Sequence, residues 1–165
     1  FHSTPELKQL FIETDNNGFT VYHEAVKSGN FLYNEILMEN LTKDEFLSIC
    51  QLKTVKGLTI LHMAAQNIHY FGEIISHLKA VFDYQTIADI MRIQDENDWH
   101  VYHYLARFNN VENFMSIFQR LEVSEQHSLL FKSVNTLNQT CLHLAAENSI
   151  YGPKIIFYIK RRNVH

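Results

Sequence analysis

Histidine is the residue type in this chain that could most directly carry chemistry, since ten of the 165 residues are histidines. His100 and His103 stand three residues apart, a spacing that places two imidazoles on one turn of a helix, as in some zinc sites. No cysteine or carboxylate stands at a standard spacing for a further ligand. The sequence therefore predicts no metal site and no cofactor.

A thiol and an imidazole also lie close together in the sequence, at Cys141 and His143. A helix start stabilises a thiolate, but a cysteine hydrolase also needs a third group that orients the histidine. The sequence marks no such group, no Gly-rich phosphate loop and no Gly-x-Ser-x-Gly elbow. We therefore predict that the chain is not an enzyme. Cys50 and Cys141 form no disulfide or metal pattern, which suits free thiols in a reducing cytosol.

Four of the histidines recur at nearly equal intervals, of 39, 41 and 40 residues. Each lies in a similar nine-residue stretch, whose clearest copy runs from Gly57 to Ala65. Self-similarity at a near-fixed period indicates stacked repeat units. The recurring histidines are His23, His62, His103 and His143.

Two further positions of the stretch have a clear physical role. The first residue must take a positive φ in a tight turn, for which glycine is best and Asn and Asp are next. Two residues later, threonine is a good helix N-cap, because its hydroxyl accepts a free backbone N–H. His100 takes the place of threonine in the third copy, so we expect that helix to begin less firmly. The turn residues are Gly18, Gly57, Asp98 and Asn138, and the caps are Thr20, Thr59 and Thr140.

A small polar residue stands three positions before each turn residue, at Asp15, Thr54, Asp95 and Asn135. The pattern Asp-x-x-Gly-x-Thr-x-x-His-x-Ala-Ala resembles the ankyrin repeat, although the family's proline is absent and the period exceeds the usual ~33 residues. The resemblance implies an all-α solenoid of about four repeats, at 15–53, 54–94, 95–134 and 135–165. In the family, the histidine hydrogen-bonds to backbone within and between turns. Carried over, this makes His23, His62, His103 and His143 structural.

The extra length of each period predicts a short third helix in the first three repeats. Thr42 and Glu45 match a capping box for a helix over 43–50. The equivalent helices are expected at 85–91 and, capped by Ser124, at 125–131. Residues 1–14 are expected to hold a helix with Pro5 in its first turn, which is either an N-terminal capping helix or the remnant of a preceding repeat. The remaining helices are predicted at 21–28, 31–39, 70–82, 111–121, 141–148 and 154–161.

The composition fits one globular domain over residues 1–165. Hydrophobic residues make up 46% of the chain and charged residues 19%, which excludes a disordered chain. No apolar run is long enough to span a membrane, and a net charge of −4 gives no basic field for nucleic acid. We expect a cytoplasmic monomer. Long repeats rich in Asn, Ile, Phe and Tyr resemble the ankyrin proteins of intracellular bacteria and viruses, which would place a secreted effector in the host cytosol.

The resemblance implies a function in binding a partner protein on a concave face, formed by the turn tips and the exposed side of each first helix. Aromatic residues and arginine dominate interface energetics, so we expect the face to centre on Trp99. Alternatively, these apolar turn residues pack against neighbouring turns. A different function is also open, that of a structural spacer or self-association element, in which the stacking ends or the aromatic row would mediate self-association. The predicted face comprises Asn16, Asn17, Phe19, Lys27, Val55, Lys56, Leu58, Gln66, Glu96, Asn97, Trp99, Arg107, Thr136, Leu137, Gln139 and Glu147.

Overall fold

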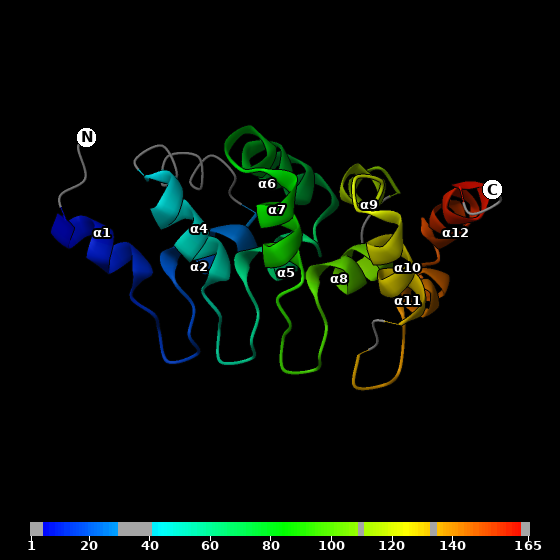
Figure 1. The fold of residues 1–165 in the computed structure, drawn as a ribbon. Helices are drawn as coiled ribbons and strands as arrows, with labels where there is room; N and C mark the ends of the chain where they lie inside the picture. The colour runs from blue at the N-terminus through cyan, green and yellow to red at the C-terminus, as the bar shows by residue number, and fades with distance from the viewer. Residues whose placement is uncertain (1–4, 30–40, 109–110, 133–134, 163–165) are drawn as a thin grey trace.

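The computed structural model describes residues 5–29, 41–108, 111–132 and 135–162, and these form an all-α protein (Figure 1). Within these ranges the only extended pairing is one antiparallel bridge between Gln94 and His100. No helix in the described part of the chain is both long and apolar enough to cross a bilayer. The predicted helix over 31–39 lies outside the described residues.

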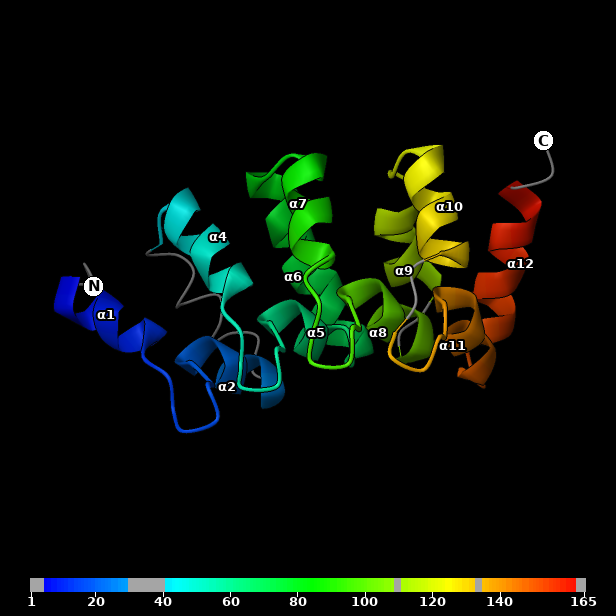
Figure 2. The ribbon, with the colours of Figure 1, turned by 60° about the horizontal axis from the view of Figure 1, so that its bottom comes forward.

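The helices follow one another in a row from one end of the molecule to the other (Figures 1 and 2). The turns project from one side of this row, and α6 and α9 lie toward the opposite side. The described helices are α1 (Pro5–Ile12), α2 (Val21–Lys27), α4 (Lys43–Gln51), α5 (Ile60–Ala64), α6 (Ile68–Val81), α7 (Tyr84–Met91), α8 (Val101–Phe108), α9 (Val111–Phe118), α10 (Val123–Phe131), α11 (Cys141–Glu147) and α12 (Gly152–Arg162).

We call the four segments 15–53, 54–94, 95–134 and 135–165 periods. The extra helix predicted in each of the first three periods is present, as α4, α7 and α10. At α4 the capping box forms as predicted: Glu45 N–H donates to the Thr42 hydroxyl, and the Glu45 carboxylate accepts from Thr42 N–H at 2.7 Å. The predicted cap of α10 was wrong. Ser124 lies inside that helix, and the N-cap is Glu122, whose N–H donates to the Glu125 carboxylate at 3.1 Å.

Two further helix ends differ from the prediction. α6 begins at Ile68 because the Asn67 side chain accepts the N–H groups of His69 and Tyr70, both at 3.1 Å. α9 ends at Phe118, before the predicted Leu121. The side chain of Leu121 is nevertheless buried, so its apolar character reflects the core and not a continuing helix.

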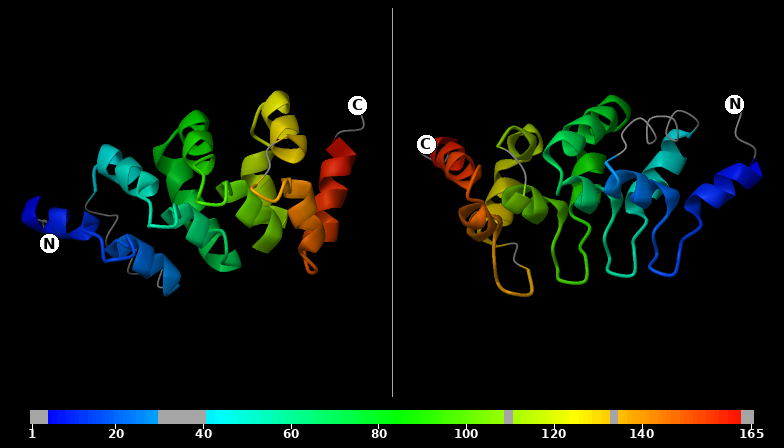
Figure 3. Two further views of the ribbon diagram at one scale, coloured as in Figure 1. Left: turned by 90° about the horizontal axis from the view of Figure 1, so that it is seen from below. Right: turned by 180° about the vertical axis from the view of Figure 1, so that it is seen from behind.

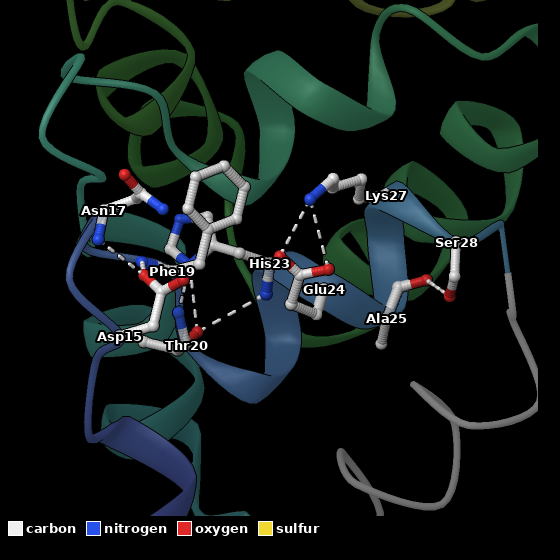
Figure 4. Close-up of polar contacts among 9 residues, drawn as sticks. All are labelled: Asp15, Asn17, Phe19, Thr20, His23, Glu24, Ala25, Lys27 and Ser28. Atoms are coloured by element: carbon white, nitrogen blue, oxygen red, sulfur yellow. Dashed lines mark hydrogen bonds and ion pairs between the residues drawn. The ribbon is translucent and has the colours of Figure 1, made fainter.

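Four turns with the same hydrogen bonds connect the helices. In the first, the Asp15 carboxylate accepts the N–H groups of Asn17 and Phe19 (Figure 4). The backbone of Asp15 pairs with Phe19 and Gly18. The equivalent backbone bonds recur at Thr54, Asp95 and Asn135. The turn residues all take a positive φ, between 57° and 78°, which is why only Gly, Asp and Asn stand there.

Successive turns contact one another through their backbones, and all four turns project in the same direction (Figure 3). Val55 N–H donates to Asn17 O at 2.8 Å, and the next two turns repeat this bond, from Glu96 to Lys56 and from Thr136 to Asn97. A β-carbon on Gly57 would lie only 2.8 Å from the Asp95 Cα. Glycine is therefore needed at this position for space as well as for φ.

The core lies between the helices of neighbouring periods. Its largest fully buried side chains include Tyr22, Phe71, Tyr102 and Phe114. Each fully buried aromatic or aliphatic side chain contributes about 1.5–3 kcal/mol relative to an exposed one. The helix pairs α8–α11 and α2–α5 bring equivalent first helices of neighbouring periods into contact.

The last described period presents an uncovered face. His143 and Ala146 are exposed, although their equivalents His62 and Ala65 are fully buried by the next period. On α12, Phe157 is 55% and Tyr158 is 50% exposed. This end of the row therefore carries exposed aromatic side chains, and the Arg161 guanidinium lies 5.2 Å from the Phe157 ring centroid.

Candidate functional site

The recurring histidines hold the turns to the helices. In the second period, the His62 Nδ1 accepts from Thr59 N–H at 3.1 Å and lies 2.9 Å from the Thr59 hydroxyl. Since this nitrogen accepts, the ring proton belongs on Nε2, which lies 3.1 Å from the Trp99 carbonyl oxygen of the next turn. His62 thus connects its own turn with the turn that carries Trp99.

The other periods repeat the Nδ1 contact. Backbone N–H groups donate to His23, His103 and His143 at 3.2 Å in each case. The Thr20 hydroxyl in turn accepts the His23 N–H at 3.4 Å, and Thr59 and Thr140 form the same reciprocal capping box with His62 and His143. Burial lowers the pKa of His62 to about 4 and lowers that of His23, so these rings are neutral at pH 7.

The third period differs from the others at the position of His100, which stands where they have threonine. This buried ring lies against His103 with 3.9 Å between centroids, and neither of its nitrogens hydrogen-bonds to a described residue. Burial lowers the pKa of His100 well below its usual value. His100 is therefore a neutral ring packed against His103. No group of three or more potential metal ligands occurs among the described residues.

Cys141 and Cys50 are both buried free thiols. Burial raises the pKa of Cys50 to about 12 and also raises the pKa of Cys141, so neither is a thiolate at pH 7. The start of α11 does not offset the loss of hydration at Cys141.

The predicted surface contains a recurring pair of side chains eight residues apart. In the first period Lys27 places its ammonium 4.8 Å from the Phe19 ring centroid, and it also pairs with Glu24 at 3.0 Å (Figure 4). In the third, the Arg107 guanidinium lies 5.4 Å from the Trp99 ring centroid. In each case the chain itself places a cation over the aromatic turn residue.

The fourth and second periods have no cation–aromatic pair at these two positions. The fourth replaces the cation–aromatic pair by a hydrogen bond of 2.6 Å from the Gln139 amide to Glu147, which also pairs with Arg107 at 3.4 Å. Three residues predicted to bind a partner, Arg107, Gln139 and Glu147, therefore contact one another across two periods. In the second period the Gln66 amide donates to His62 O at 3.4 Å, so the residue equivalent to Lys27 and Arg107 carries no charge.

A groove of about 520 Å³ opens beside Leu58 and Gln66, the equivalent pair of the second period. It brings together turn residues of three successive periods and the exposed side of α8. The residues that line it are Lys56, Leu58, Gln66, Asp95, Glu96, Asn97, Trp99, Tyr104, Phe108, Thr136 and Leu137.

Three lining residues were not predicted as partner-binding: Asp95, Tyr104 and Phe108. Tyr104 stacks edge-on against Trp99, with 5.1 Å between centroids, and donates its hydroxyl to Asp95 at 2.7 Å. Phe108 is 42% exposed. Their spacing of four residues on one helix face was the available signal, since such residues lie one above the other.

The remaining predicted residues lie elsewhere. Phe19 lines a separate hollow of about 590 Å³ beside Glu13, Val21 and Glu24. Asn16 and Asn17 are exposed at the tip of the first turn, and Val55 is exposed at the second. The groove therefore unites Leu58 with Trp99 but does not include Phe19.

No protein-family model matches the chain, and no curated protein matches it significantly.

Proposed function

We propose that this chain is a divergent ankyrin-repeat module that binds a partner protein in the groove around Trp99. The observation that carries the proposal is the groove itself, which extends over three turns and exposes apolar side chains. Leu137 is 72% and Phe108 is 42% exposed there, and Trp99 is only half-buried. Contiguous apolar surface with a polar rim is typical of interaction sites.

The ankyrin assignment is supported by the recurring turn. Four times, a polar side chain accepts within its own turn, a residue of positive φ follows, and a histidine caps the next helix. Successive turns are joined by one backbone hydrogen bond each. The exposed concave side of such turns is the surface on which the family binds proteins.

A charge placed at the rim tests the proposed function. Leu137→Glu puts a carboxylate on an exposed groove residue, so we expect loss of partner capture with little change in stability. Val123→Glu is the matched control, because Val123 is 77% exposed at the start of α10 and does not line the groove. Partners lost with Leu137→Glu but kept with Val123→Glu would support the proposal. Capture that survives Leu137→Glu would place the binding surface elsewhere.

The uncovered face of the last period favours a second candidate, self-association. Phe157 and Tyr158 on α12 and the exposed His143 and Ala146 lie at this end. A self-associating chain should be dimeric or larger by light scattering at micromolar concentration, and Phe157→Glu should return it to a monomer. A monomeric wild-type protein would remove this candidate.

A further inference from the structure

The chain fills the space over two of its turns with its own cations, and this shows what chemistry that space accepts. Lys27 lies over Phe19 and Arg107 lies over Trp99, each eight residues after the aromatic residue. In the second period the equivalent residue is Gln66, which carries no charge. At the position where the first and third periods place a cation, the second period therefore has an uncharged side chain, and this side chain lines the groove.

Aromatic side chains form one wall of the groove. Trp99, Tyr104 and Phe108 all line it. Tyr104 is within 5.1 Å of Trp99 and 6.1 Å of Phe108, measured between ring centroids. Ring faces attract an ammonium or guanidinium group, and the attraction increases as the group leaves water.

The charges around the groove also favour a cation. Asp95 is buried, and its carboxylate accepts from Trp99 N–H at 2.9 Å and from the Tyr104 hydroxyl. Glu96 is exposed, and no cation of the described residues forms an ion pair with it. Among the residues that line the groove, the carboxylates of Asp95 and Glu96 stand with one ammonium, that of Lys56. The Arg107 guanidinium lies beside the groove, 5.4 Å from the Trp99 and 5.3 Å from the Phe108 ring centroid.

We propose that the groove receives an arginine or lysine side chain from an extended segment of the partner protein. The aromatic wall contacts the stem and the cationic head, Asp95 and Glu96 supply the opposite charge, and the exposed Leu137 contacts an apolar neighbour of the basic residue. This inference rests on the proposed function, because it names the chemistry of the partner that binds at the same groove.

The inference makes opposite predictions for two neighbouring charges. Glu96→Gln removes an attractive carboxylate and should lower the affinity for a basic peptide about threefold. Lys56→Gln removes a repulsive ammonium and should raise that affinity by a similar factor. Asp44→Asn and Lys154→Gln are matched controls, since both residues are exposed and do not line the groove. Neither control should change binding.

The probe is a random-peptide phage library selected on the immobilised protein. Selected peptides are then synthesised with each basic residue intact or replaced by glutamine, and titrated by the fluorescence of Trp99, the only tryptophan in the chain. We expect a shared Arg or Lys beside an apolar residue, and at least tenfold weaker binding after its replacement.

The outcomes separate the two claims. Peptides that bind the wild type but not Leu137→Glu, and whose affinity is unchanged when the basic residue is replaced, would overturn this inference and leave the proposed function standing. An unchanged affinity in both Glu96→Gln and Lys56→Gln would also overturn it. A selection in which no peptide depends on Leu137 would count against the proposed function itself, and the inference would fall with it.

Discussion

Replacing Gly57 with alanine tests whether the turns contact one another through their backbones. Gly57 has φ +75°, a conformation that costs a non-glycine residue about 1–2 kcal/mol. Its added β-carbon would lie 2.8 Å from the Asp95 Cα and 3.0 Å from the Glu96 nitrogen. These are backbone atoms, which cannot rotate away, and overpacking of this kind costs a further ~1–3 kcal/mol. We therefore expect Gly57→Ala to lower the free energy of unfolding by about 2–5 kcal/mol.

Gly29 provides a matched control. Its φ is +70°, but an added β-carbon would meet no atom of a described residue within 4 Å. Gly29→Ala should therefore cost only the conformational part, about 1–2 kcal/mol. Urea unfolding followed by circular dichroism at 222 nm gives both values, provided that the slopes agree. Equal destabilisation by the two substitutions would refute the close approach of the second and third turns.

Three further predictions concern the core and its titratable groups. Because burial lowers the pKa of His62 to about 4, the unfolded chain binds a proton first, so stability is lost as the pH falls below about 6.5. The loss in the free energy of unfolding should amount to about 2 kcal/mol between pH 7 and pH 5. His62→Gln should remove that part of the pH dependence, and an unchanged pH profile would contradict a lowered pKa of His62. Ala64 is fully buried, so Ala64→Leu should overpack the contact between helices and cost ~1–3 kcal/mol, whereas an unchanged melting temperature would show that Ala64 faces no neighbour. Because burial raises the pKa of Cys50 to about 12 and raises that of Cys141, a disulfide reagent at pH 8 should modify both thiols in urea but neither in the folded protein; rapid modification of the folded protein would argue against their burial.

The sequence predicted helices well where a local signal fixes their start. The Thr42–Glu45 capping box placed α4 correctly, because both of its hydrogen bonds are local. At α10 a second capping pair, Glu122 with Glu125, stands two residues before the predicted Ser124 and determines the start instead. Such competition between neighbouring caps is decided by the direction in which the chain enters the helix, which a local pattern does not contain.

The site was less predictable, because its geometry depends on contacts between periods. Trp99 and Leu58 were identified from their common position in the turn. Arg107 and Glu147 were assigned to the partner, yet they pair with each other because the third and fourth periods are adjacent. Tyr104 and Phe108 were missed because their side of α8 is a wall of the groove only in combination with Leu58 and Gln66, which belong to the preceding period. The sequence of one period does not reveal which pair leaves such a space.

The central claim is that a partner binds in the groove around Trp99, and chemical-shift mapping tests it most directly. A bound partner or selected peptide should shift the single indole N–H resonance, which only Trp99 can produce, together with the backbone signals of Leu58, Gln66, Phe108 and Leu137. Val123, which does not line the groove, should not shift. Shifts confined to α12, around Phe157 and Tyr158, with an unmoved indole signal would contradict the account and place recognition at the uncovered end of the row.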